Sequence, residues 1–267
     1  MDMTYRTFLS VAAGSVLVLG LSGCGSSETT TTESGANVIE EGKLSVCTQL
    51  PYQPFEFRRG GEVVGFDISM MDLVAEDQGL TVDIVQTPFE GIQSGQALNT
   101  GQCDIAAAGM TITEDRAKVI DFSDPYFEAT QALLVKKGAP YDSLEALAGK
   151  RIAVQQGTTG EIYTKENAPK NAKIQVFEDL GLLTTAVKTG QVDAAVQDNG
   201  PLLDFVQKNP DTEVTAEFDT GEEYGFAVKK DGNDELLEAT NDVISKAKED
   251  GTYDELYKKW FGAAPKS

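Results

Sequence analysis

Short apolar runs alternate with longer amphipathic stretches along most of the chain. Strand-length apolar runs and helical patterns follow one another at 44–47, 67–78, 82–85, 92–99 and 105–108. This β-α-β-α-β order predicts a parallel sheet that is covered by helices on both faces. Between the first strand and the first helix, residues 55–64 alternate around a Gly-Gly pair, which predicts a small β-hairpin.

The same order returns in the second half of the chain, with a strand at 152–154, a helix at 159–167 and a strand at 174–176. A seven-residue segment that joins a helix to a strand also occurs twice, at 100–106 and 189–195, with five identical positions. We infer two similar α/β lobes.

The C-terminal region predicts a strand at 224–228 and helices at 234–249 and 253–261. It is too short to be a third domain, so we expect it to return to the first lobe. The predicted organisation is lobe 1 at 42–127 plus 225–262, lobe 2 at 131–219, and a hinge at 128–130 and 220–224. Ligands of open α/β sheets bind beyond the carboxyl ends of the strands. Two such lobes joined by two crossings therefore predict a cleft that closes on a small molecule.

The N-terminus has the pattern of a bacterial lipoprotein signal. An apolar run of 14 residues follows an arginine, and at about 1.5 Å per residue it spans roughly 21 Å, short of a ~30 Å hydrocarbon core. It indicates a signal peptide at 1–23. Leu21-Ser22-Gly23-Cys24 resembles a lipobox, in which Cys24 would carry the lipid. The alternative is a buried structural cysteine after an ordinary signal. The polar segment 24–41 is predicted to be a Ser/Thr-rich tether.

Charge and composition exclude several function classes. The chain has 22 basic and 43 acidic residues and a net charge of -21, so a phosphate backbone would be repelled and no nucleic-acid partner is expected. It has no histidine, which excludes Ser-His-Asp and Cys-His catalytic groups and imidazole-based zinc sites. No metal or cofactor is predicted.

Several short segments match a known family in chain order. They are Pro54-Phe55-Glu56-Phe57, Gly65-Phe66-Asp67, Gly109-Met110-Thr111-Ile112-Thr113-Glu114-Asp115-Arg116, Ile120-Asp121-Phe122-Ser123, Gly157-Thr158-Thr159, Gln197-Asp198 and Gly251-Thr252-Tyr253. Over 42–262 the chain resembles family 3 of the bacterial extracytoplasmic solute-binding proteins, the glutamine and lysine/arginine/ornithine-binding type of amino-acid ABC transporters. The resemblance implies a two-lobed periplasmic-binding-protein fold of type II. In that fold, two parallel or mixed sheets are flanked by helices and joined by a two-crossing hinge.

The resemblance also implies how the ligand headgroup is held. Arg116 is similar to the arginine that clamps the α-carboxylate, and a guanidinium fork suits that group because it offers two parallel N–H bonds. Thr111 resembles the threonine that bonds the same group through its hydroxyl and N–H. The Gly109 carbonyl would accept from the ligand ammonium. Asp198 resembles the aspartate of the second lobe that pairs with that ammonium, so a zwitterion would bridge the cleft.

Further site residues follow from the same alignment of motifs. Thr158 and Thr159 precede a predicted helix, whose first N–H groups attract a carboxylate. Tyr52 and Phe89 fall on positions whose rings enclose the ligand side chain. Gln49 and Gln155 depart from the family pattern, in which charged residues are common. A charged ligand side chain would lack a partner there, so we expect a polar, uncharged side chain such as that of glutamine.

The remaining cysteines, Cys47 and Cys103, invite a disulfide in an exported protein. Cys47 lies two residues before Gln49 and Cys103 six before Gly109, on strands that should end together at the cleft. A stagger of four residues at ~3.3 Å is about 13 Å, more than a disulfide tolerates. We therefore expect two buried free thiols.

These inferences favour a monomeric, lipid-anchored binding protein on the extracytoplasmic face of a bacterial membrane, not an enzyme. It would pass a small amino acid to an ABC transporter permease. The alternative is a cyclohexadienyl or arogenate dehydratase-like enzyme on the same fold, which needs a cleft carboxylate as general acid. A sensory domain is a third alternative, but no transmembrane or kinase segment follows the predicted lobes.

Overall fold

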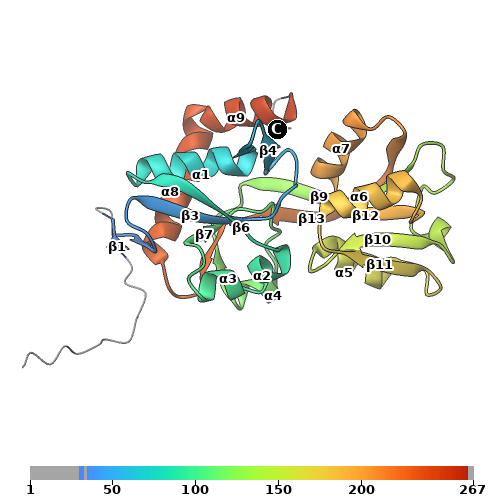
Figure 1. Cartoon of the computed structure of the whole chain (residues 1–267), viewed down its shortest axis with the longest axis horizontal. Coiled ribbons are helices and arrows are strands. Elements are labelled where there is room, and N and C mark those ends of the chain that lie inside the picture. Colours follow the sequence, from blue (N-terminus) through green and yellow to red (C-terminus); the bar gives the residue numbers. More distant parts are fainter. Residues whose placement is uncertain (1–29, 33–34, 264–267) are drawn as a thin grey trace, which may run out of the picture.

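The computed structural model describes residues 30–32 and 35–263, and these form two α/β lobes that lie side by side (Figure 1). Each lobe is built on a five-stranded sheet. The lobe that contains β3 is called lobe 1, and the other is called lobe 2. The predicted signal peptide and Cys24 lie outside the described residues.

The sheet of lobe 1 has the strand order β6-β3-β7-β14-β8. These strands are β3 (Lys43–Thr48), β6 (Thr81–Gln86), β7 (Ile105–Ala106), β8 (Ile120–Phe122) and β14 (Ala227–Lys229). The pairing of β3 with β6 and β7 is parallel, as predicted. The pairing of β14 with β7 and β8 is antiparallel, so the sheet is mixed. The C-terminal part of the chain thus returns to lobe 1, as expected.

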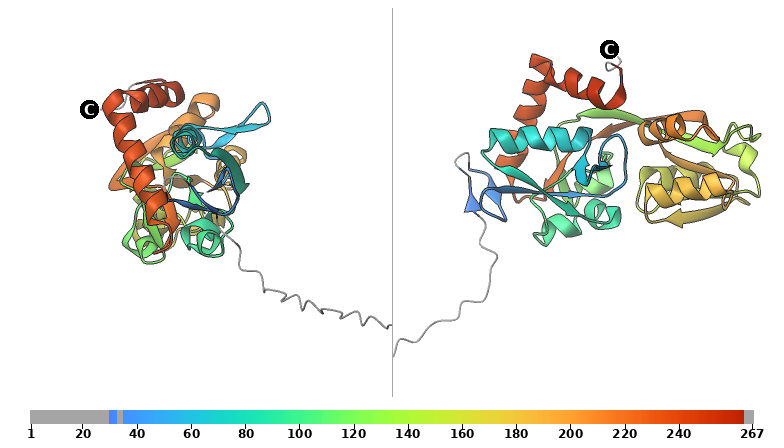
Figure 2. Two further views of the ribbon diagram at one scale, coloured as in Figure 1. Left: turned by 90° about the vertical axis from the view of Figure 1, so that its left-hand side faces the viewer. Right: turned by 45° about the horizontal axis from the view of Figure 1, so that its top comes forward.

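Helices cover both faces of this sheet (Figure 1). One face carries α1 (Phe66–Asp77), α8 (Asp234–Asp250) and α9 (Thr252–Phe261), and the other carries α2 (Phe89–Gln93), α3 (Gln96–Asn99) and α4 (Glu114–Ala117). Figure 2 shows the C-terminal helices α8 and α9 lying against lobe 1. The helix predicted at 92–99 is divided, because Gly95 adopts a left-handed φ of 74° between α2 and α3. The predicted hairpin is present as β4 (Phe57–Arg59) and β5 (Glu62–Val64).

The sheet of lobe 2 has the strand order β11-β10-β12-β9-β13. Its strands are β9 (Phe127–Lys136), β10 (Arg151–Gln155), β11 (Lys173–Phe177), β12 (Ala194–Asp198) and β13 (Thr212–Tyr224). β10 pairs in parallel with β11 and β12, whereas β9 is antiparallel to β12 and β13. The helical segments of this lobe are η1 (Glu145–Leu147), α5 (Thr159–Asn167), α6 (Leu180–Thr189) and α7 (Asn199–Lys208).

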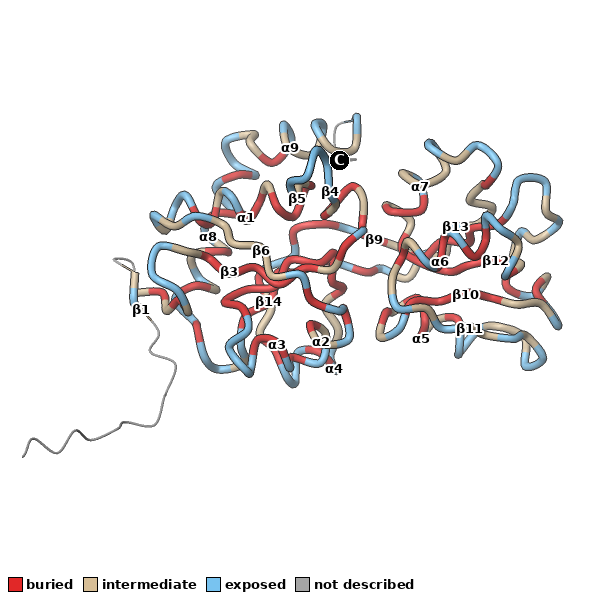
Figure 3. The backbone as a smooth tube through the Cα atoms, in the orientation of Figure 1, coloured by how far each residue is buried: buried red, intermediate tan, exposed pale blue. Residues whose placement is uncertain are grey.

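The long strands β9 and β13 run side by side between the lobes (Figure 1). Their pairing begins at Phe127 and Tyr224 in lobe 1 and ends at Lys136 and Thr212 in lobe 2. The register shifts between Val214 and Ala216 and again between Phe218 and Glu222. The second shift overlaps the predicted hinge segment 220–224. Figure 3 shows that the central strands of both sheets are mostly buried.

The repeated seven-residue segment has the same structural role in both lobes. Gly101 and Gly190 adopt left-handed φ angles of 69° and 81°, which end the preceding helices. The Asp104 carboxylate then accepts the Ser45 N–H of β3, and the Asp193 carboxylate accepts the Arg151 N–H of β10, both at 2.8 Å. The glycine turns the chain, and the aspartate fixes it to the neighbouring parallel strand of its own sheet.

Cys47 and Cys103 form a disulfide, so the prediction of two free thiols is wrong. Both residues are buried as expected, but the two Cα atoms are only 5.6 Å apart. The prediction placed both residues on straight strands with a stagger of four. In the structure Cys47 lies opposite Ala106, and Cys103 lies in the segment before β7 begins. The stagger along straight strands therefore does not determine the distance between the two Cα atoms.

We expect a Cys47→Ala/Cys103→Ala variant to lose about 2–4 kcal/mol of unfolding free energy, because a bridge across 56 residues restricts the unfolded chain. Urea unfolding of the variant and of the oxidised wild type measures this difference. Reductant should destabilise the wild type and leave the variant unchanged. Equal midpoints for the oxidised wild type and the variant would contradict the prediction.

The last residues of the predicted tether pack on lobe 1 instead of extending freely. The short strands β1 (Thr30–Thr31) and β2 (Asn37–Val38) pair with each other, and Ala36 and Val38 are buried. The Asn37 N–H donates to the Asn233 side chain, which donates in return to the Asn37 carbonyl. Among the described residues, no helix is both long and apolar enough to cross a membrane.

Candidate functional site

A cavity of about 20 Å³ lies between the two lobes. It is lined by Gln49, Tyr52, Glu56, Phe89, Ala108, Gly109, Thr111, Arg116, Gln155, Thr158, Thr159 and Asp198. All ten ligand-binding residues predicted from the sequence are in this set. A volume of this size holds about one water molecule, so the two lobes are closed on each other.

Arg116 is held in place by a helix cap and by two backbone carbonyls. The Thr113 hydroxyl caps α4 by accepting the Arg116 N–H at 3.2 Å. The guanidinium donates to the Thr111 carbonyl at 2.6 Å in lobe 1 and to the Gly157 carbonyl at 2.9 Å in lobe 2. Its Cζ lies 5.2 Å from the centre of the Phe89 ring. This cation therefore contacts both lobes.

Burial and the neighbouring carboxylates have opposite effects on the Arg116 pKa. The side chain is only 5 % exposed. Burial lowers the Arg116 pKa, whereas the Asp198 and Glu222 carboxylates raise it. A guanidinium remains protonated in proteins, so the site keeps a fixed positive charge.

Gly109 follows β7 at a position that only glycine fits. It has a φ of 50°, and a Cβ atom there would lie 2.5 Å from the Tyr52 ring. The Gly109 N–H donates to the Asp67 carboxylate at 2.9 Å, and the Tyr126 hydroxyl donates to the same carboxylate at 2.8 Å. Burial raises the Asp67 pKa to about 6. The Gly109 peptide is thus oriented by a buried carboxylate beneath it.

Asp198 ends β12 and is 3 % exposed. Its carboxylate accepts from the Tyr52 hydroxyl of lobe 1 at 2.5 Å, from the Tyr224 hydroxyl, and from the Gln131 side-chain amide at 2.6 Å. The Asp198 pKa is raised to about 6, because burial and then the neighbouring Glu222 charge raise it by more than the three hydrogen-bond donors lower it. A carboxylate with this pKa is mostly ionised at neutral pH and is available to pair with a cation.

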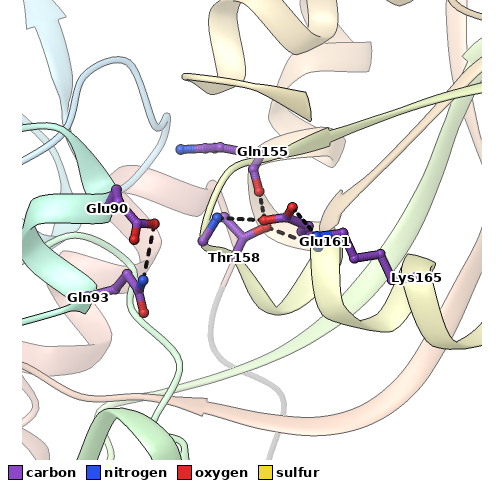
Figure 4. A network of polar contacts seen from close by, with 7 residues as sticks. Glu90, Gln93, Gln155, Thr158, Glu161 and Lys165 are labelled. Atoms are coloured by element: carbon purple, nitrogen blue, oxygen red, sulfur yellow. Dashed lines mark hydrogen bonds and ion pairs between the residues drawn. The ribbon is translucent and has the colours of Figure 1, made fainter. Parts of the chain in front are cut away.

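The N-terminus of α5 is partly satisfied by its own lobe (Figure 4). The Thr158 hydroxyl caps the helix by accepting the Glu161 N–H. The Gly157 N–H donates to the Glu161 carboxylate at 2.7 Å, and Lys165 pairs with the same side chain at 2.6 Å. The sequence predicted N–H groups at this turn that are free for a carboxylate, but the Gly157 N–H already has a partner. Thr158 and Thr159 still line the cavity.

Three glutamine side chains form a chain of hydrogen bonds at one end of the site. Gln197 donates to Gln155 at 2.8 Å, and Gln155 donates across the lobes to Gln49 at 2.6 Å. Gln49 then donates to the Glu178 carbonyl of lobe 2 at 3.2 Å. This end of the site is polar and carries no formal charge on these three side chains.

Sequence reasoning missed three buried polar residues of the site. Glu56 lines the cavity and is 1 % exposed, and burial followed by the Asp67 charge holds its pKa well above the usual range. Gln131 and Glu222 lie on the crossing strands β9 and β13. Glu56 belongs to a matched motif that was given no role. Nothing in the sequence distinguishes Glu222 from the other acidic residues, because its position depends on the register of β13.

Comparison with known proteins adds independent findings. Residues 44–263 match the family described as bacterial extracellular solute-binding proteins, family 3. The ABC transporter glutamine-binding protein GlnH of Bacillus subtilis is 40 % identical over 209 residues, which cover 77 % of this chain and 75 % of that protein. Two solved structures are also similar. An ancestral arginine-binding protein bound to arginine has a TM-score of 0.79 and 44 % identity, over 83 % of this chain and 99 % of that one. The ancestral amino acid-binding protein AncCDT-1, described as a precursor of cyclohexadienyl dehydratase, has a TM-score of 0.76 and 42 % identity, over 82 % and 96 %.

The family match covers more than half of the chain, and both solved structures share the arrangement of two mixed sheets flanked by helices. These findings agree with the resemblance that the sequence motifs indicated. The chain belongs to the bacterial extracellular solute-binding proteins of family 3 and has their two-lobed periplasmic-binding fold of type II.

Proposed function

We propose that the protein is the extracytoplasmic substrate-binding component of an ABC transporter for polar amino acids. The observation that carries this proposal is the pair of buried, opposite charges, Arg116 and Asp198, which line one cavity from different lobes. An α-amino acid carries the two complementary charges on adjacent groups. GlnH and the arginine-bound ancestral protein, both similar over most of the chain, support an amino acid as the ligand.

In this account the ligand headgroup bridges the lobes. The Arg116 guanidinium uses two of its N–H groups for the Thr111 and Gly157 carbonyls, and its remaining N–H groups bind the α-carboxylate. The Asp198 carboxylate and the Gly109 carbonyl accept from the α-ammonium. The cavity of this closed form holds only about one water molecule, so the lobes must part to admit a ligand. When they close on an amino acid they bring both charges to it, so the ligand favours closure. The lobes would be 42–127 with 225–262 and 131–219, moving about 128–130 and 220–224.

The side-chain end of the site favours a polar, uncharged group. Gln155 donates a hydrogen bond to Gln49 across the lobes. A ligand amide placed between them could replace this bond with one hydrogen bond to each glutamine. Tyr52 and Phe89 would enclose its methylene groups. A cationic side chain would be buried there without a partner, at a cost of several kcal/mol. We therefore propose glutamine as the favoured ligand.

The melting temperature of the protein, stripped of co-purified ligand by unfolding and oxidative refolding, tests this assignment against each of the twenty L-amino acids. A ligand at 100 times its dissociation constant should add ~2.7 kcal/mol to the folded state. Stabilisation by glutamine above the others supports the proposal. Stabilisation by arginine or lysine alone would contradict the side-chain assignment, and no stabilisation by any of the twenty would contradict the headgroup assignment.

Replacing Gln49 by Glu should shift the preference toward cationic amino acids, because it places a carboxylate at the side-chain end of the site. We expect the ratio of the arginine to the glutamine association constant to rise by at least about 10-fold. Calorimetric titration of wild type and variant with both amino acids gives this ratio. Gln53→Glu, a nearby change outside the cavity lining, is the matched control, and an equal shift in that control would contradict the local explanation.

A second candidate function is that of a cyclohexadienyl or arogenate dehydratase-like enzyme. The observation that favours it is Glu56, a buried carboxyl group with a raised pKa that lines the cavity and could act as a general acid. AncCDT-1, which is similar to this chain, is described as a precursor of cyclohexadienyl dehydratase. The test is turnover of prephenate and arogenate by the purified protein. Turnover that is lost in Glu56→Gln would favour the enzyme.

The same proposal includes the location of the protein in the cell. The lipobox at Cys24 would anchor a monomer to the extracytoplasmic face of the membrane, beside its permease. The Cys47–Cys103 disulfide supports an oxidising compartment, because such bridges persist mainly outside the cytoplasm. Mass spectrometry of the membrane-bound protein tests the anchor, since a diacylglycerol on Cys24 is expected and an unmodified Cys24 would contradict it.

A further inference from the structure

Glu222 is a buried carboxylate on the crossing strand β13 that contacts both lobes. It is 9 % exposed. Its Oε2 atom accepts from the Thr111 hydroxyl of lobe 1 and from the Thr159 hydroxyl of lobe 2, both at 2.8 Å. The side chains of Thr111 and Thr159 line the cavity, whereas Glu222 lies behind them. One carboxylate oxygen therefore meets one hydroxyl from each lobe.

A hydroxyl group has one proton, so the partner of that proton determines whether the group can donate a hydrogen bond to a ligand. A hydroxyl that donates to Glu222 has no second proton to donate, so it can only accept from a group in the cavity. In the structure both hydroxyls donate to Glu222 Oε2, which fixes the direction of both bonds. Thr111 and Thr159 therefore present lone pairs, not protons, to the ligand.

A third contact fixes the carboxylate itself. The Gln131 amide nitrogen lies 3.0 Å from Glu222 Oε1 and 2.6 Å from Asp198 Oδ1. Its two protons can serve one carboxylate each. The same nitrogen lies 3.2 Å from the Thr159 hydroxyl oxygen, which keeps one lone pair for a ligand even when it accepts this contact. Gln131 thus joins Glu222 to the carboxylate assigned above to the ligand ammonium.

We propose that Glu222 is a positioning residue for the ligand ammonium, because it turns the Thr111 and Thr159 hydroxyl groups into acceptors for that ammonium. The inference rests on the proposed function and deepens it. It changes the expectation that the Thr111 hydroxyl bonds the α-carboxylate, which it cannot do while it donates to Glu222. It also adds Thr159 to the ammonium side of the site, although the sequence had assigned it to the carboxylate.

The test compares ligands with and without the ammonium in wild type and Glu222→Gln. The probes are L-glutamine and 4-carbamoylbutanoate, in which hydrogen replaces the ammonium, with L-arginine and 5-guanidinopentanoate as a second pair. Titrations at about pH 8 keep Asp198 ionised in each protein. Glu222→Gln can turn its amide protons toward the hydroxyls, so we expect the amino acid to bind about 10- to 100-fold more weakly. The analogue without ammonium should change less than about 3-fold.

Glu223→Gln is the matched control, because Glu223 is the adjacent exposed carboxylate and has no side-chain role at the cavity. It should leave all four affinities unchanged. Thr159→Val, which keeps the shape and removes one hydroxyl, provides a second variant if Glu222→Gln does not fold. It should also weaken the amino acid selectively.

A purely structural role of Glu222 would weaken the amino acid and its analogue equally, and that outcome would overturn the inference. Unchanged affinity for the amino acid would overturn it as well. If wild type binds neither member of either pair, the proposed function itself fails, and the inference fails with it. That failure is distinguishable because it is already present in the protein without substitutions.

Discussion

Arg116→Ala should bind its amino acid at least about 100-fold more weakly than wild type, because truncating one partner of a buried charge pair costs 2–5 kcal/mol or more. The substitution also leaves Asp198 and Glu222 without the fixed cation that now offsets them. The Thr111 and Gly157 carbonyls lose their donor at the same time. Isothermal titration of the stripped variant, with a thermal melt to verify folding, measures the loss.

Arg116→Lys separates charge from geometry in the same experiment. An ammonium keeps the positive charge but cannot offer two parallel N–H groups in one plane. We expect it to recover only a small part of the lost affinity. Full affinity in Arg116→Lys would show that the planar fork is not required. Affinity within a few-fold of wild type in Arg116→Ala would show that the carboxylate is bound elsewhere.

Asp198→Asn should abolish binding and stabilise the ligand-free protein. The Asp198 pKa is raised from 3.8 to about 6 in the folded protein. The stability associated with this group is therefore fully present below pH 3.8 and is lost as the pH rises through about 6. This rise in pKa corresponds to at most about 3 kcal/mol at pH 8. An uncharged asparagine would recover only part of it, because its amide nitrogen cannot accept the hydrogen bond that one carboxylate oxygen accepts now.

Urea unfolding of the ligand-free proteins at pH 8 and pH 4 measures this difference. The gain of Asp198→Asn over wild type should be large at pH 8 and small at pH 4. Asp211→Asn replaces an exposed carboxylate and serves as the control, with no comparable pH dependence expected. An Asp198→Asn variant that is less stable than wild type at pH 8 would contradict the assigned charge burial.

Sequence reasoning predicted the parts of the fold that depend on local patterns. The β-α-β order of both lobes follows from alternating apolar runs. Helix α5 has the predicted bounds, and Thr158 caps its N-terminus. The repeated glycine and aspartate positions lie at equivalent turns, where a left-handed φ requires glycine. The site residues taken from family motifs meet at one cavity because each motif follows a strand end or begins a helix.

Features that depend on long-range register could not be predicted in the same way. The disulfide was missed because Cys103 precedes β7, and the position of a residue beside a strand is not given by strand spacing. Glu222 was missed because the register of β13 shifts just before it, between Phe218 and Glu222. That shift determines which of two adjacent glutamates faces the site. The mixed pairing of β14 likewise depends on the direction from which the chain returns to lobe 1.

One cleft between the lobes is proposed to hold both charged groups of an α-amino acid. The most direct test is calorimetric titration of the stripped wild-type protein with its preferred amino acid and with two analogues, one without the α-carboxylate and one without the α-ammonium. We expect each analogue to bind at least about 30-fold more weakly, because each leaves Arg116 or Asp198 buried without its partner. An analogue that binds as tightly as the amino acid would contradict the claim.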